Sequence, residues 1–316
     1  MHRDQIVPGT RFAQSSGGAI PDTGRAAYVL WNSPEPPLPI LVAVPHSGRD
    51  YPAGALASMR DPEQARLRLE DRYVDAIATR LAAETGASLL VAQAPRALID
   101  LNRSVEDVDW SMISGEVLRS SRHSVANRRS RNGLGLVPRR IPGLGEIWRG
   151  QTPAAQLEAR IAGIYRPYHA ALGAELDRLR DAWGAALLVD LHSMPPLRPA
   201  GPEDRPAQFV VGDRFGASCH PGLVDMTLRY FGDHRRRVSL NRPYSGGYIL
   251  DRFGHPRRGI HALQLETCRS TYLDTRLDQP SARIVSVARL LAGLVRALAA
   301  EVGEIGGAGR LAQAAE

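Results

Sequence analysis

The chain has 316 residues, enough for one large α/β domain or two modest ones, and its composition of 43% hydrophobic and 23% charged residues excludes a disordered protein. All 40 positively charged side chains are arginines, so Schiff-base and P-loop chemistry, which need lysine, are excluded. The chain has only two cysteines and no CxxC pair, which excludes a disulfide scaffold. The net charge of +7 is consistent with binding of nucleic acid, with an acidic substrate or with a preference for arginine codons.

The two ends of the chain predict a cytoplasmic protein without membrane contacts. Residues 1–16 are polar and contain no apolar signal region. The apolar stretch Ser281–Val302 carries Arg283, Arg289 and Arg296 on one stripe, which predicts an amphipathic surface helix. We expect an N-terminal arm over residues 1–38, one domain over 39–302 and a C-terminal tail over 303–316.

Apolar runs alternate with helical patterns after residue 38. Pro39–Pro45 reads as a buried strand, and Asp61, followed by Pro62, is typical of the start of a helix, here running to about Glu84. A second long helix begins at Thr152, with a kink at Pro167, and extends to about Trp183. Further short strands are expected at Ser88–Ala92, Arg96–Leu101, Ala185–Leu191, Gln208–Val211 and His261–Leu265.

Strands separated by helices predict an α/β fold. The central sheet should be mixed but mostly parallel, with helices on both faces. In such sheets, ligands bind outside the carboxyl ends of the strands.

Three of the predicted strands end on residues suited to metal chemistry. One is followed by His46, one ends on His192 and one ends on Glu266. If these strands are neighbours, two imidazoles and a carboxylate converge at one edge of the sheet.

The first predicted helix supplies a further carboxylate. Asp71 falls inside its apolar stripe, which includes Leu67, Val74 and Leu81. A carboxylate on a buried face is costly unless it binds a cation or pairs with an arginine such as Arg103. Two histidines and one carboxylate form the ligand set of catalytic zinc, which lowers the pKa of its bound water. Glu266 would then serve as the general base.

A second group of residues suggests an anionic ligand. Arg96 and Asn102-Arg103 lie in one segment, and Arg242, Tyr244 and the pair Gly246-Gly247 in another. Arginine matches a carboxylate with two parallel hydrogen bonds, and glycines let backbone N–H groups approach a ligand. Surface ion pairs and a plain hairpin turn are the alternatives.

The chain resembles the N-formylglutamate amidohydrolases (N-formylglutamate deformylases) through eight stretches in order. These are VPHSGRDYP (44–52), LEDRYVD (69–75), APRALIDLNR (94–103), NGLGLVP (132–138), YRPYH (165–169), DLHSMPP (190–196), LNRPYSGGYI (240–249) and HALQLE (261–266).

The resemblance implies a fold like the zinc exopeptidases (phosphorylase/hydrolase-like) and cleavage of N-formyl-L-glutamate to formate and L-glutamate, a step of histidine degradation. It implies His46, Asp71 and His192 as ligands of Zn²⁺ or another divalent transition metal, and Glu266 as the acid/base. The wider zinc carboxypeptidase group places glutamate three residues after the first histidine, where this chain has Arg49, so Asp71 is expected as the third ligand and Glu70 is the alternative.

The resemblance also suggests how the substrate is held. Asn102-Arg103 is similar to the carboxylate-binding pair of the wider group, and Arg96 to its carbonyl-polarising arginine. Arg103 and Arg242 would bind the two substrate carboxylates, while Asn102, Tyr244 and the amides of Gly246 and Gly247 orient it. The arginine-rich segment 119–140 is a candidate lid that attracts the anion.

Two other functions fit parts of the pattern. One is a zinc amidase or deacylase acting on another N-acyl amino acid or on a peptidoglycan peptide. The other is a non-enzymatic nucleic-acid binder, disfavoured because its arginine segment is nearly devoid of aromatic residues that stack on bases. It would use Arg119, Arg122, Arg128, Arg129, Arg131, Arg139 and Arg140.

Overall fold

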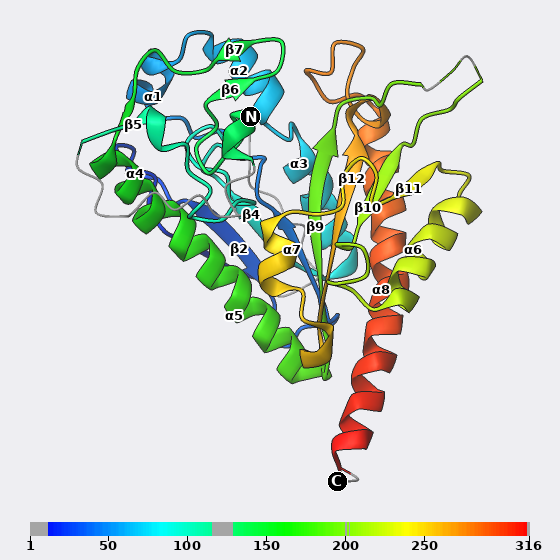
Figure 1. Ribbon diagram of the computed structural model, residues 1–316. Coiled ribbons are helices and arrows are strands. Elements are labelled where there is room, and N and C mark those ends of the chain that lie inside the picture. The colour runs from blue at the N-terminus through cyan, green and yellow to red at the C-terminus, as the bar shows by residue number, and fades with distance from the viewer. Residues whose placement is uncertain (1–11, 116–128, 200, 202, 315–316) are drawn as a thin grey trace.

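A mixed sheet of eight strands forms the centre of the molecule (Figure 1). The structure is a computed structural model that describes residues 12–115, 129–199, 201 and 203–314. The strands follow one another across the sheet in the order β1 (Ala13–Gly17), β2 (Tyr28–Asn32), β4 (Ser88–Ala92), β3 (Ile40–Val44), β9 (Ala186–Met194), β12 (Ile260–Cys268), β10 (Phe209–Gly212) and β11 (Val238–Leu240).

The four central strands, β4, β3, β9 and β12, run parallel to one another. Strands β1 and β2 add an antiparallel edge on one side, and β10 pairs antiparallel with β12 on the other, where β11 is parallel to β10. The predicted α/β class with a mixed, mostly parallel sheet is confirmed.

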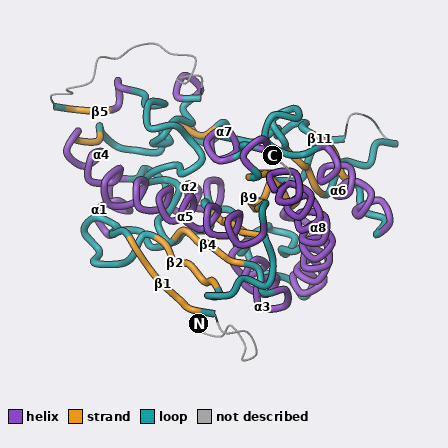
Figure 2. Tube along the Cα trace, turned by 90° about the horizontal axis from the view of Figure 1, so that it is seen from below, coloured by secondary structure: helices purple, strands orange, loops and turns teal. Residues whose placement is uncertain are grey.

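Helices cover both faces of this sheet, as Figures 1 and 2 show. Alternate residues of each strand point to opposite faces, so Leu188 of β9 packs in one core and the adjacent Val189 in the other. The first core includes α2 (Pro62–Leu69), α4 (Ala154–Arg160), α5 (Arg166–Trp183) and α7 (Tyr248–Phe253), and the second includes α3 (Val74–Thr85), α6 (Pro221–Asp233) and α8 (Arg283–Ala314). The remaining short elements are α1 (Ala53–Ser58), the pair β5 (Ile113–Ser114) with β8 (Thr152–Pro153), and the pair β6 (Arg140–Ile141) with β7 (Gly145–Glu146).

Both ends of the chain are more regular than the sequence suggests. The region expected as an arm contributes β1 and β2, because the apolar side chains Ala27 and Leu30 are buried in the first core. The region expected as a tail continues α8 to Ala314. Arg283, Arg289 and Arg296 are exposed on α8, as its amphipathic pattern predicts. Among the described residues, no helix combines the length and apolar character that crossing a bilayer requires.

Three predicted elements differ from the structure. The first helix breaks after Leu69 into α2 and α3, and Arg96–Leu101 forms turns, since Leu98 N–H donates to the carbonyl of Pro95 rather than to a neighbouring strand. The second long helix contains a π-helical turn at Ile161–Tyr165, just before the expected kink. Asp61 caps α2 as predicted, accepting the N–H of Gln64 at 3.0 Å.

Replacing leucine by alanine should lower the free energy of unfolding much more in the core of the sheet than at its edge. Leu263→Ala in β12 should lower the free energy of unfolding by about 2–5 kcal/mol, because this side chain is fully buried. Leu240→Ala in β11, where the leucine is 39% exposed, should cost less than about 1 kcal/mol. Urea denaturation of both variants measures the difference, and equal losses would contradict the assigned layers.

Candidate functional site

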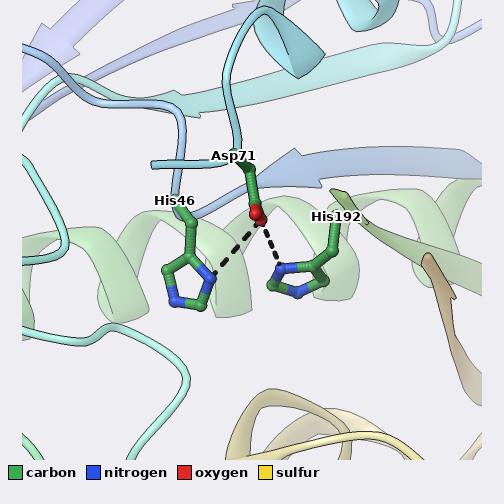
Figure 3. A group of neighbouring side chains, drawn as sticks. All are labelled: His46, Asp71 and His192. Carbon is green, nitrogen blue, oxygen red and sulfur yellow. Dashed lines mark hydrogen bonds and ion pairs between the residues drawn. The ribbon is translucent and has the colours of Figure 1, made fainter. Parts of the chain in front are cut away.

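His46, Asp71 and His192 lie together in a buried cluster, with His46 just after β3 and His192 near the carboxyl end of β9 (Figure 3). The Asp71 Oδ2 atom lies 3.0 Å from Nδ1 of His192 and 3.6 Å from Nδ1 of His46. The three side chains come from a strand end, a strand and the connection between two helices. They are therefore brought together only by the fold.

The break between α2 and α3 places Asp71 in this cluster. Glu70 ends α2 in an extended conformation, and Tyr73 starts α3 from a left-handed one, with φ of 59°. Between them, the backbone N–H of Asp71 donates to the carbonyl of His46 at 2.9 Å. Asp71 is buried as predicted, but at a helix break and not on a continuous helical face.

Glu70, the alternative ligand, points elsewhere. Its buried carboxylate accepts hydrogen bonds from Arg66 at 3.4 Å and Arg72 at 3.2 Å. Arg49, which occupies the glutamate position of the wider group, forms an ion pair with Asp75. The group of side chains that can hold a cation thus contains Asp71 and not Glu70.

Arg269 fixes the Asp71 segment from the end of β12. Its guanidinium donates to the carbonyls of Leu67 and Glu70 at 2.9 and 2.6 Å and lies 3.7 Å from the Asp71 carboxylate. It also donates to Ser193 Oγ, which in turn donates to Asp71 Oδ1 at 3.2 Å. The sequence analysis missed Arg269, although it follows Glu266 by only three residues.

Each histidine has a buried carboxylate behind it. Asp100 Oδ1 lies 2.8 Å from Nε2 of His46, and Asp190 Oδ2 lies 2.8 Å from Nε2 of His192. A carboxylate on one ring nitrogen fixes the tautomer and turns the other nitrogen toward a metal. Both Nδ1 atoms are therefore presented to the same point beside Asp71.

The cluster fits a divalent cation on two grounds. Its three ligand atoms lie within 4.8 Å of one another. The Nδ1 of His46 is buried and makes no hydrogen bond within the described part of the chain, which is costly for a polar atom that binds nothing. Nitrogen and oxygen donors of this kind suit zinc and similar transition metals.

The pKa shifts of the cluster residues also favour a bound cation. Burial alone would raise the pKa of Asp71, but the hydrogen bond with His192 and the nearby imidazole of His46 hold that pKa well below its usual value. Burial opposes protonation of His192, yet Asp190 and Asp71 raise the pKa of this imidazole well above its usual value. The surroundings of the cluster thus favour positive charge at its centre.

Glu266 lies beside this cluster, because it is the residue of β12 paired with His192 of β9. Its Oε1 accepts a hydrogen bond from Gln264 at 2.8 Å. Burial raises the pKa of Glu266 to about 7. A carboxylate with this pKa can take up and return a proton near neutral pH.

An arginine-rich cavity of about 260 Å³ opens onto the cluster. It is lined by the predicted residues Arg96, Asn102, Arg103, Tyr244, Gly246 and Gly247, together with the three cluster residues and Glu266. Arg68 and Arg269 also line it and were not predicted, and Arg129 lines it from the segment predicted as a lid. A cavity with five arginines is suited to a small anion.

Arg242 does not line this cavity and is exposed. The preceding Asn241 is buried, with its side chain hydrogen-bonded to Asp213, and the carbonyl of Arg242 accepts from Ser239. These contacts turn the loop so that Arg242 faces solvent. The predicted clamp by Arg242 is wrong for this structure.

The two glycines have a structural role of their own. A Cβ on Gly247 would lie 2.4 Å from Asn102 Oδ1, and Gly246 has a φ of 101° that side chains disfavour. Asn102 Oδ1 accepts the backbone N–H of Ile249 at 2.9 Å. The glycine pair therefore lets the loop pack against Asn102, while its predicted contact with substrate stays a prediction.

Arg103 is held by backbone carbonyls and not by Asp71. Its guanidinium donates to Leu134 at 2.9 Å and to Asn102 at 2.7 Å. Leu134 belongs to the predicted lid segment 119–140, of which residues 119–128 lie outside the described residues. In the described part, Leu136 and Val137 are buried in the first core, and Arg139 pairs with Asp109 and Glu146. These contacts give Arg139 two acidic partners within the protein.

Residues 38–273 match the family model for N-formylglutamate amidohydrolase. The chain belongs to this family. It is 31% identical over 247 residues to an N-formylglutamate deformylase of Pseudomonas putida, with 75% of this chain and 82% of that protein covered. A Pseudomonas aeruginosa protein of the same name is 30% identical over 241 residues, covering 75% and 83% of the two chains.

Two solved structures resemble the fold. The crystal structure of N-formylglutamate amidohydrolase from Ralstonia eutropha JMP134 superposes with a TM-score of 0.78 at 31% identity, covering 88% of this chain and 99% of that one. A gene product of Agrobacterium tumefaciens superposes with a TM-score of 0.63 at 16% identity, covering 87% and 96% of the two chains. The second likeness concerns the fold alone.

Asp100→Asn should weaken metal binding without removing a ligand. The neutral amide holds His46 less firmly, and losing such a partner typically reduces metal affinity about 10–100-fold. Competition with a chromophoric chelator measures the dissociation constant for Zn²⁺. Asp177→Asn, on the exposed face of α5, is the control and should leave it unchanged. Equal affinity in the Asp100 variant would contradict its supporting role.

Proposed function

We propose that this protein is a cytoplasmic, zinc-dependent enzyme that hydrolyses N-formyl-L-glutamate to formate and L-glutamate, as a step of histidine degradation. The observation that carries the proposal is the buried group of His46, Asp71 and His192 at the base of a cavity lined by arginines. Membership of the N-formylglutamate amidohydrolase family supports the substrate.

His46, Asp71 and His192 would hold the metal, which is zinc or another divalent transition metal. When bound, such an ion acts as a Lewis acid that lowers the pKa of a water molecule and polarises a carbonyl. The Asp100 and Asp190 carboxylates keep both Nδ1 atoms directed at that position. Arg269 and Ser193 keep the third ligand in place.

Glu266 would act as the general base and then as the general acid. It accepts a proton from the attacking water and returns it to the nitrogen of the leaving glutamate. Its pKa of about 7 suits both steps. Arg96, which donates to Asp100 at 2.9 Å and lines the cavity, would stabilise negative charge on the formyl oxygen.

The arginines of the cavity would bind the carboxylates of the substrate. N-formylglutamate carries two carboxylates, and Arg103 is a fixed guanidinium on the cavity wall. Asn102, Tyr244 and the amides of Gly246 and Gly247 would orient the substrate. Since Arg242 does not line the cavity, the second carboxylate would be bound by an arginine that does, either Arg68 or Arg129.

Metal analysis tests the ligand set. The purified chain should contain about one zinc ion per molecule, and His46→Ala or His192→Ala should lose both the metal and the release of formate from N-formylglutamate. His234→Ala, at the exposed end of α6, is the control and should keep both. Full activity in metal-free protein, or in either ligand variant, would overturn the proposal.

Glu266→Gln should retain the metal and lose about two to four orders of magnitude in kcat, the usual scale for a general base. In the parent protein, kcat/KM should rise with pH as Glu266 ionises, with a midpoint at or below about 7 because a bound cation favours the carboxylate. Glu158→Gln on α4 is the exposed control. Normal turnover by the Glu266 variant would exclude this role.

Arg103→Ala should raise KM for N-formylglutamate far more than for an uncharged formamide such as N-butylformamide. The guanidinium recognises charge, which only the first substrate carries. Steady-state kinetics with both substrates measure the increase in KM for each of them. Arg166→Ala, at an exposed position of α5, is the control. A panel of N-formyl, N-acetyl and N-succinyl amino acids then identifies the acyl group. Equal increases in KM for both formamides would exclude the carboxylate contact.

A further inference from the structure

A second cavity, of about 500 Å³, lies away from the metal cluster. Its walls include Leu98, Trp148 and Arg160, none of which lines the arginine-rich cavity. The turn that contributes Leu98 also carries Arg96, which faces the first cavity. The two cavities therefore share one turn of the chain but no lining side chain. A volume of this size is typical of small-molecule sites.

Arg160 is the notable feature of the second cavity. It is the last residue of α4, just before the π-helical turn, and only 8% of it is exposed. Its guanidinium donates to the Leu98 carbonyl at 3.1 Å and lies 5.7 Å from the centre of the Trp148 ring. Within the described ranges 12–115, 129–199 and 203–314, no carboxylate forms an ion pair with it.

A buried guanidinium without a carboxylate is costly. Burial lowers the pKa of Arg160 to about 10, and Asp22 offsets this only in part. Arginine has five N–H donors, and the described contacts use one of them. The site therefore presents a desolvated positive charge and free hydrogen-bond donors to a cavity large enough for a ligand.

The walls indicate the kind of anion that fits. Leu98, Trp148 and Ala159 provide apolar surface, so an apolar body is favoured over a fully hydrated inorganic ion. A single arginine balances one negative charge, and the carboxylate of Asp22 on the same cavity disfavours a second. A planar carboxylate matches the guanidinium with two parallel hydrogen bonds.

We propose that this cavity is a second ligand site, separate from the active site, which binds a monoanionic organic acid with its carboxylate on Arg160 and its apolar part against Trp148. The inference does not depend on the proposed deformylase activity. It concerns binding, so its test does not require turnover.

Calorimetric titration of the full chain with phenylacetate tests the site, and phenylacetamide is the neutral probe of the same shape. We expect one phenylacetate bound per chain and at least about tenfold weaker binding of phenylacetamide, since hydrogen bonds to charged groups are the stronger ones. Arg160→Gln should weaken phenylacetate binding by a similar factor. Arg166→Gln, on the exposed part of α5, is the matched control and should bind normally.

Two further variants separate the alternatives. The Arg103→Ala variant should bind phenylacetate normally. If this variant lost binding, the anion would lie in the active site and the proposal would be overturned. Ala159→Phe places a bulky ring in the cavity while keeping Arg160, so it should also weaken binding, and it replaces Arg160→Gln as the test if that variant does not fold. No heat of binding at millimolar phenylacetate, or equal affinity for the amide, would overturn the proposal as well.

Discussion

The buried carboxylate of Asp71 is the constraint on which the site depends. A negative charge removed from water must be compensated, and here the Nδ1 atoms of His46 and His192 face it from two neighbouring strands. The helix break at residues 70–73 and the hydrogen bonds of Arg269 hold this carboxylate in place. A divalent cation between these groups would satisfy all three. The chain thus gives up a continuous helix to bring one carboxylate to the sheet edge.

The parallel strands at the centre of the sheet position His46, His192 and Glu266. Strands β3, β9 and β12 are adjacent, so their carboxyl ends meet at one edge. The register pairs His192 with Glu266, which puts the proposed base beside a proposed metal ligand. Because successive side chains of a strand point to opposite faces, the residues just before His192 and Glu266, which are Leu191 and Leu265, pack into the second core. Rigid, fully buried strands therefore hold groups whose spacing the chemistry depends on.

Arginine has different roles in different parts of this molecule. Arg269 and Arg72 connect the region around residues 67–72 to the chain that follows β12, and Arg139 pairs with two acidic side chains on the surface. Arg103 instead lines the site cavity, with its orientation fixed by backbone carbonyls. The overall charge does not distinguish these roles. Only the local partners of each guanidinium show whether it can receive a ligand.

The sequence by itself determined the fold class, the polar residues near the ends of the central strands and the residues of the cluster, because strand periodicity and the ordered motifs are local signals. The ordered motifs also predicted that His46, Asp71, His192 and Glu266 belong to one site. Tertiary structure alone decided how Asp71 arrives there, since the break after Leu69 is stabilised by Arg269, a residue 200 positions further along the chain. It likewise turned Arg242 to solvent and excluded Glu70, because contacts between distant segments, which no local pattern records, determine where each side chain points.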